Sequence, residues 1–213
     1  MLGLYLLKKM KVNFNYFPNI GYITADVPSD LLLELDKIIN EKELERYNKN
    51  LAGNIRKEFF IKKAIPIFQN YILDLCLKYD DEFNYLKGID VCTNDVPLIL
   101  HKMWVNFQEK HEFNPLHTHS GLFSFVIWIK IPFYNKDEKN SSPGKDSNHN
   151  LAGCFEFQYC NSLGSIIGHS IQADKEWEGK ICLFPANLNH SVYPFYSSND
   201  YRISVSGNVC LKT

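Results

Sequence analysis

The chain has 213 residues and a formal net charge of −1, and hydrophobic residues make up 45% of it. This length suits one domain with a sizeable core, and the composition is that of a folded globular protein. No basic block stands out, so we predict no nucleic-acid partner. No apolar run approaches the ~18 residues that a membrane span needs, so we predict no membrane association.

The cysteines and the beginning of the chain indicate the compartment. Six cysteines form no CxxC pair and follow no regular spacing. Several stand inside apolar runs, as Cys182 does, where a buried free thiol is expected. The opening Met1–Leu7 is too short for a secretory signal and is followed by lysines. We therefore expect a cytoplasmic protein without a disulfide framework. The composition is compatible with a homodimer as well as with a monomer.

The first part of the chain is predicted to be mainly helical. Weak alternation over 16–25 indicates a short strand. An apolar stripe at helical spacing follows over 31–39, directly after a Pro-Ser-Asp sequence at 28–30 that offers capping chemistry. A second helix is predicted over about 55–78, and Pro66 should kink it or end one of its segments.

From about residue 96 the pattern changes to short strands separated by turns. The run at 122–132 is unusually apolar and suits the core of a sheet, whereas the polar segment 134–150 is predicted to be an exposed loop. The predicted strands are 98–107, 122–132, 153–159, 165–172, 179–184, 191–195 and 201–209. Helices followed by about seven short strands predict an α+β fold with a jelly-roll sandwich. We expect one domain over 1–213, with helical support over about 1–95 and a jelly-roll core over about 96–213.

Three histidines in the β-rich part could share a metal ion. His117 and His119 stand two positions apart, and on an extended segment such residues point to the same face. His190 follows the apolar strand predicted at 179–184 and a short turn. Each feature also has a simpler interpretation, namely a pair of surface histidines and a structural histidine whose hydrogen bonds are satisfied.

Arg202 is the fourth candidate. The chain has three arginines against twenty lysines, so arginine is rarely used where lysine would serve. Ser204 lies on the same face of the predicted strand. A guanidinium entering a sheet needs a partner and suits a carboxylate in bidentate geometry, although an edge-strand salt bridge would also explain it.

A predicted hairpin joins these features. The turn-forming residues 197–200 lie between His190 and Arg202. If they close an antiparallel hairpin centred near Tyr196, then His190 lies opposite Arg202, with Cβ atoms about 5 Å apart. A metal on the histidine and an anion on the arginine would then share one pocket.

The pattern resembles the 2-oxoglutarate- and Fe(II)-dependent oxygenase superfamily, whose motif is H-x-D/E, a distant histidine, and an arginine about ten residues later, often as R-x-S. The corresponding residues are His117-Thr118-His119, His190 and Arg202-Ile203-Ser204. Stretches at 50–55, 114–124 and 179–190 are also similar to a group of small oxygenases from bacteria and their phages.

The resemblance implies a double-stranded β-helix, or jelly roll, with N-terminal helices packed on one sheet. It implies that His117, His119 and His190 hold Fe(II), and that Arg202 and Ser204 bind 2-oxoglutarate as co-substrate. Oxidative decarboxylation of 2-oxoglutarate would then drive hydroxylation of a small-molecule or protein substrate. Further candidates for co-substrate contact, with a packing role as the alternative, are Asn106 and Ser124.

The chain departs from the superfamily motif at His119, where a carboxylate is usual. Either the metal has three histidine ligands, or only one of His117 and His119 ligates and water or another side chain takes the remaining position. Cupins use H-x-H, and their second motif fits the spacing of Gly179, Pro185 and His190. However, 121–125 lacks the glutamate of the first cupin motif. A 2-oxoglutarate-independent cupin dioxygenase or isomerase and a non-catalytic jelly-roll module therefore stay as alternatives.

Overall fold

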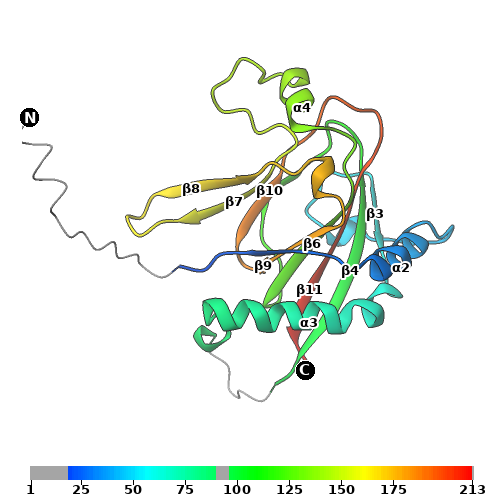
Figure 1. Cartoon of the computed structure of the whole chain (residues 1–213), viewed down its shortest axis with the longest axis vertical. Helices are drawn as coiled ribbons and strands as arrows, with labels where there is room; N and C mark the ends of the chain where they lie inside the picture. The colour runs from blue at the N-terminus through cyan, green and yellow to red at the C-terminus, as the bar shows by residue number, and fades with distance from the viewer. Residues whose placement is uncertain (1–18, 90–95, 213) are drawn as a thin grey trace, which may run out of the picture.

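The computed structural model describes residues 19–89 and 96–212, in which eleven strands form two antiparallel sheets beside three α-helices (Figure 1). The larger sheet contains, in spatial order, β1 (Ile23–Asp26), β9 (Lys180–Pro185), β6 (Phe123–Lys130), β11 (Arg202–Leu211), β4 (Leu98–Gln108), β3 (Lys57–Phe60) and β2 (Glu45–Arg46). The smaller sheet contains β5 (Asn114–His117), β10 (Asn189–Val192), β7 (Phe155–Cys160) and β8 (Ile166–Ile171). The helices are α2 (Ser29–Ile39), α3 (Ala64–Phe83) and α4 (Asn135–Ser141), with short 3₁₀ turns at Asn48–Asn50, Leu86–Gly88 and Lys175–Trp177.

Two apolar clusters explain why β6 is so hydrophobic. Alternate residues of a strand point to opposite faces of its sheet. On one face, Phe123 and Ile127 pack in the cluster that also contains residues of α2 and α3, which cover this side of the larger sheet (Figure 1). On the other face, Val126 and Trp128 pack with Phe155 and other residues of the smaller sheet. Because both faces of β6 are buried, no polar alternation appears in its sequence.

The predicted fold class is confirmed: the chain is α+β, with two facing antiparallel sheets of a double-stranded β-helix and N-terminal helices on the larger sheet. All seven predicted strands are present, with ends shifted by up to three residues. Among the helices of the described ranges, none is both long and apolar enough to cross a membrane. Met1–Leu7 and Cys92 lie outside the described residues.

The prediction of a helix beginning near residue 55 was wrong. Lys57–Phe60 forms β3 at the edge of the larger sheet, and α3 begins only at Ala64. Pro66 lies in the first turn of α3, where a proline is tolerated because backbone N–H groups there have no partner within the helix. The predicted cap of α2 is also not formed, since Pro28 occupies that position and no side chain bonds to the helix end.

The segment 134–150 is not only an exposed loop. Its first residues form α4, and Glu138 within this helix is completely buried. The Glu138 carboxylate accepts hydrogen bonds from the backbone N–H groups of Tyr196 (2.7 Å) and Ser197 (3.0 Å) and from the Ser197 hydroxyl (2.6 Å). A side chain that looked solvated in the sequence therefore fixes the connection between β10 and β11.

The predicted hairpin between His190 and Arg202 was also wrong. β10 belongs to the smaller sheet and β11 to the larger one, so the chain crosses between sheets instead of turning back within one. His190 pairs with His117 on β5 and with Phe157 on β7, whereas Arg202 pairs with Gln108 on β4. Turn-forming residues indicate a change of direction, but they do not determine which strand the chain pairs with next.

Candidate metal centre

Two strands and one loop bring the three predicted histidines together between the sheets. His117 on β5 and His190 on β10 are directly paired, so their side chains share a face. His119 lies two residues beyond β5, where its backbone N–H donates to the carbonyl of Ala186 at 2.8 Å. One ligating nitrogen from each histidine lies within 4.8 Å of the others, and Nε2 of His190 is 3.2 Å from Nε2 of His119.

Backbone carbonyls set the orientation of two of the three rings. Nδ1 of His117 lies 2.7 Å from the carbonyl oxygen of Pro115, and Nδ1 of His190 lies 2.9 Å from that of Leu188. A carbonyl can only accept a hydrogen bond, so each Nδ1 must carry the proton. The lone pair of each ring then resides on Nε2, and this is the arrangement that fixes a histidine as a metal ligand.

Burial keeps the three imidazoles neutral. Burial and His117 lower the pKa of His119 to about 4, and burial lowers that of His117. Burial, together with the two other histidines, lowers the pKa of His190 well below its ordinary value. Its ring is 2% exposed and stacks on Phe155 with ring centroids 5.5 Å apart. Three neutral nitrogen donors suit a divalent first-row transition metal, so the residues present fit Fe(II).

A narrow cavity of about 40 Å³, which opens to solvent, adjoins the three histidines. Its apolar lining includes Trp104, Val126, Phe155 and Phe184. Its polar lining, apart from the histidines, consists of Glu58, Asn106, Asn114, Ser204 and Ser206. No lysine or arginine is present among these lining residues of the described chain. Ser204 and Asn106 therefore face the same space as the histidines.

Arg202 has a different environment. It shares a face of β11 with Ser204, but it is not among the residues that line this pocket. Its Nε and Nη2 donate to Oε1 of Gln108 (3.0 and 2.8 Å), Nη1 to the carbonyl of Gly153 (2.7 Å) and Nη2 to that of Tyr193 (2.8 Å). The guanidinium thus joins the two sheets, and its hydrogen bonds are largely taken by the protein itself.

Two rings and deep burial complete the surroundings of Arg202. Phe195 and Phe133 lie 5.4 and 5.9 Å from its guanidinium carbon, measured to the ring centroids. Burial lowers the pKa of Arg202 to about 10, which leaves it charged at neutral pH. Ser124, the other secondary candidate, donates to the carbonyl of Gly207 (3.2 Å) and to Oδ1 of Asn208 (3.1 Å), so its hydroxyl is bonded within the sheets.

Glu58 and Asn114 were not identified from the sequence. Glu58 lies within the stretch 55–78 that was predicted to be a helix, and a glutamate in such a helix is expected on its solvent-exposed face. Asn114 stands only three residues before His117, at the start of β5. The similarity noted at 114–124 covers Asn114, and it was a signal that could have drawn attention to this residue. Glu58 lies outside the similar stretches and had no such signal.

A double-stranded β-helix with a cluster of inward-facing histidines defines a class of mononuclear metal enzymes that includes oxygenases and cupins. The family model described as "Putative 2OG-Fe(II) oxygenase" matches residues 102–208, about half of the chain, and this segment contains all three histidines. The chain belongs to this family, whose cofactor is Fe(II) and whose co-substrate is 2-oxoglutarate.

Solved structures with the same fold include two oxygenases. A prolyl-4-hydroxylase from Pseudomonas putida is 14% identical, with a TM-score of 0.54 over 91% of this chain and 94% of that one. An oxidoreductase of the 2OG-Fe(II) oxygenase family from Burkholderia pseudomallei is 13% identical, with a TM-score of 0.50 over 89% of this chain and 84% of that one. Comparison with curated protein sequences gave no match.

Proposed function

We propose that this oxygenase is a hydroxylase-type dioxygenase whose reaction takes place at His117, His119 and His190. The observation that carries the proposal is the convergence of three neutral imidazoles within 4.8 Å, in a pocket between the sheets. Fe(II), when bound, supplies the redox chemistry by which dioxygen oxidises 2-oxoglutarate and hydroxylates a substrate C–H bond. One oxygen atom enters succinate as carbon dioxide leaves, and the other enters the new hydroxyl group.

The protein's own residues contribute position and a dry environment. The carbonyls of Pro115 and Leu188 hold two of the imidazoles in the ligating tautomer. Apolar side chains such as Val126 and Phe184 limit the access of water to the reacting atoms. We assign His119 as the third ligand, because its ring is buried, neutral and in reach of His190.

We also propose that Ser204 and Arg202 bind the carboxylate of 2-oxoglutarate that lies farther from the metal. Ser204 already faces the pocket. Gln108 Oε1 accepts from Nε and Nη2 of Arg202, the edge with which a guanidinium binds a carboxylate in bidentate fashion. Co-substrate binding at Arg202 therefore requires the Gln108 amide to turn away.

The enzymatic test measures succinate. Purified protein with Fe(II), dioxygen and 2-oxoglutarate should form succinate, and omission of Fe(II) or dioxygen should abolish it. His117→Ala should lose the activity, whereas His149→Ala, in an exposed loop, should retain it. Fe(II) binding by the wild-type protein without any succinate would overturn the proposal.

One observation favours a second candidate, a metal-dependent dioxygenase that does not use 2-oxoglutarate. The pocket has no cationic lining residue in the described chain, and the donors of Arg202 are occupied. Gln108→Ala separates the two functions, because it frees the guanidinium edge. A lower KM for 2-oxoglutarate supports the first candidate. Turnover that depends on the metal and dioxygen, and that is the same with and without 2-oxoglutarate in the wild type and in Gln108→Ala, supports the second.

We further propose that the protein works in the cytoplasm. The five cysteines in the described ranges, among them Cys76, Cys154 and Cys182 in the core, are free thiols, as expected in a reducing compartment. Fractionation of cells that express the full chain tests this, and recovery in a secreted or periplasmic fraction would contradict it.

A further inference from the structure

The pocket contains a buried carboxylate without a cationic partner. Glu58 on β3 is 1% exposed and lines the same space as the three histidines. From the part of the chain that the structure describes, its carboxylate accepts one hydrogen bond, from Nδ2 of Asn48 to Oε2 at 3.2 Å. Among the described residues, no lysine, arginine or histidine forms an ion pair with it. A buried carboxylate is normally paired with a cation or accepts several hydrogen bonds.

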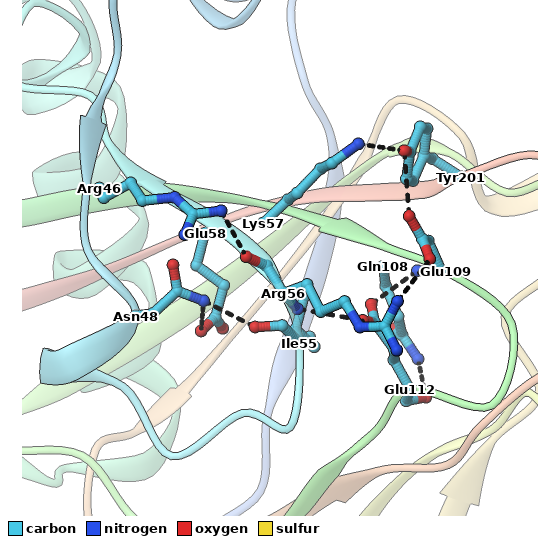
Figure 2. Close-up of polar contacts among 10 residues, drawn as sticks. All are labelled: Arg46, Asn48, Ile55, Arg56, Lys57, Glu58, Gln108, Glu109, Glu112 and Tyr201. Atoms are coloured by element: carbon cyan, nitrogen blue, oxygen red, sulfur yellow. Dashed lines mark hydrogen bonds and ion pairs between the residues drawn. The ribbon is translucent and has the colours of Figure 1, made fainter.

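The cations closest in sequence are engaged elsewhere, as Figure 2 shows. Arg46 donates to the backbone carbonyl of Arg56 at 3.1 Å, and Arg56 itself lies 3.8 Å from a carboxylate oxygen of Glu112. Lys57, the neighbour of Glu58, points to the other face of β3 and donates to the hydroxyl of Tyr201. The protein therefore leaves the charge of Glu58 uncompensated although three basic residues are near it in the sequence.

Two further acceptor oxygens face the same space. Asn106 on β4 is directly paired with Glu58 in the strand register, so the two side chains lie on one face of the sheet. The Oδ1 atoms of Asn106 and Asn114 are both buried, and no donor within the described ranges reaches them. A Cβ at Gly53 would lie 2.6 Å from Oε1 of Glu58 and would also clash with Oδ1 of Asn114. Glycine at this position keeps these oxygens open to the pocket.

The other completely buried glutamate shows how unusual Glu58 is. Glu138 accepts three hydrogen bonds, at 2.6 to 3.0 Å, and serves the fold. Glu58 accepts one weak bond and faces a cavity. In keeping with this geometry, burial and the nearby Glu112 raise the pKa of Glu58 to about 7, so the charged form needs compensation. A bound cation would provide it.

We propose that the substrate carries an ammonium or guanidinium group, and that Glu58 binds this group together with Asn106 and Asn114. Such a group supplies both the positive charge and the several N–H donors that the three oxygens lack. The alkyl part of the substrate would extend toward the apolar walls and the three histidines. This inference rests on the proposed function, because it names the substrate class of the same pocket.

The first experiment measures binding without turnover. Zn(II)-substituted protein with 2-oxoglutarate is titrated with L-arginine and L-lysine and with L-citrulline and L-norleucine, whose side chains are neutral, by calorimetry or ligand-observed NMR. Each probe is used free and as its N-acetylated, C-amidated form, because the α-ammonium group of a free amino acid is itself a cation. We expect the cationic probes to bind at least about tenfold more tightly, which is the contribution of one charge-assisted hydrogen bond. Equal binding of charged and neutral probes would overturn the inference.

Variants then assign the effect to Glu58. Glu58→Gln should remove the preference for the cationic probes, and Glu58→Asp should retain part of it. Glu45→Gln, which changes an exposed glutamate on β2, should leave the preference intact. Thermal midpoints and Zn(II) stoichiometry establish that each variant is folded. A folded Glu58→Gln protein that keeps the full preference would contradict the assignment.

A second experiment separates this inference from the proposed function and identifies the source of the cation. Succinate formation by the Fe(II) enzyme is measured with each free amino acid and with its N-acetylated, C-amidated form. Stimulation by free basic amino acids alone indicates a small-molecule substrate, and stimulation by the blocked forms indicates a protein side chain. If succinate forms but neither cationic form stimulates it, the inference fails and the proposed function stands. If no succinate forms under any condition, the proposed function fails.

Discussion

The three-histidine centre and Arg202 belong to the same sequence motif, yet they differ in whether their hydrogen-bonding atoms are free. In His117 and His190, Nδ1 donates to a backbone carbonyl, which leaves Nε2 for a ligand. In Arg202, by contrast, Nε, Nη1 and Nη2 already donate hydrogen bonds to Gln108, Gly153 and Tyr193, respectively. One region is ready to bind a ligand, and the other already holds the two sheets together.

This contrast shows that a motif identifies residue types but not whether their bonding capacity is free. The same guanidinium that could bind a carboxylate also satisfies buried carbonyl oxygens, which would be costly to leave unpaired. The region around the histidines should therefore respond mainly in metal affinity when it is altered, and the region around Arg202 mainly in stability.

The largest effect is expected at the histidine centre. His190→Ala removes one of three ligating nitrogens and should weaken Fe(II) or Zn(II) binding by at least about 100-fold, since loss of even an outer partner of a ligand costs 10–100-fold. Competition with a chromogenic chelator measures the affinity. His149→Ala, in an exposed loop, is the control and should bind as the wild type does. Unchanged affinity in His190→Ala would place the metal elsewhere.

Substitution of Arg202 is expected to lower the stability of the fold. Arg202→Lys cannot reproduce the four hydrogen bonds to Gln108, Gly153 and Tyr193. The free energy of unfolding of the metal-free protein should fall by about 3 kcal/mol, because buried carbonyl oxygens lose their donors. Urea unfolding measures this, with the exposed Arg46→Lys as a matched control. A variant of wild-type stability would contradict the structural role of Arg202, whereas a raised 2-oxoglutarate requirement beside the loss of stability would support the binding role proposed above.

The resemblance implied that His190 joins His117 and His119, and the structure brings it there through the pairing of β10 with β5, which has no local signal. The spacing of His117 and His119, by contrast, is a local signal that does not depend on which strands pair. The same holds for the apolar run of β6, whose two buried faces determine its composition.

What the sequence could not predict depends on pairing between distant segments. The expected opposition of His190 and Arg202 failed because the intervening residues cross between sheets. Glu58 was missed because the four residues of β3 are too few to show alternation beside a long helix. Its burial is created by the strand pairing with β4 and by the loop at Gly53, neither of which has a local signature.

A third prediction concerns Glu58, which is buried as Arg202 is but makes far fewer hydrogen bonds. Its pKa is raised from an ordinary value of 4.5 to about 7, chiefly by burial. The unfolded chain therefore releases this proton at lower pH than the folded protein does, so stability is lost as the pH rises from about 4.5 to about 7. Glutamine has no proton to lose and avoids this cost.

Glu58→Gln should accordingly be more stable than the wild type at pH 8 and close to it at pH 4. The pKa shift corresponds to at most about 3 kcal/mol, and screening by solvent in the pocket reduces the expected gain to about 1 to 2 kcal/mol. Urea unfolding at both pH values measures the difference. Glu138→Gln, whose carboxylate is well bonded, should instead be destabilised at pH 8. A wild-type protein that is the more stable at pH 8 would show that Glu58 is compensated within the fold.

The smallest effect is expected at Arg56. It tests whether an arginine is important in this chain merely because arginines are rare in it. The Arg56 guanidinium lies 3.8 Å from Glu112 and 3.9 Å from Glu109, and its side chain is 81% exposed. Pairs of this kind contribute less than about 0.5 kcal/mol, because water screens the charges and the long side chain loses entropy. Arg56→Lys should therefore change the free energy of unfolding, measured with urea, by no more than about 0.5 kcal/mol. The corresponding change for Arg202→Lys is about 3 kcal/mol.

A loss above about 1 kcal/mol in Arg56→Lys would be more than an exposed pair supplies, and it would show that arginine is selected here for its planar geometry. A small loss would mean that burial, and not rarity in the sequence, sets the importance of an arginine in this protein.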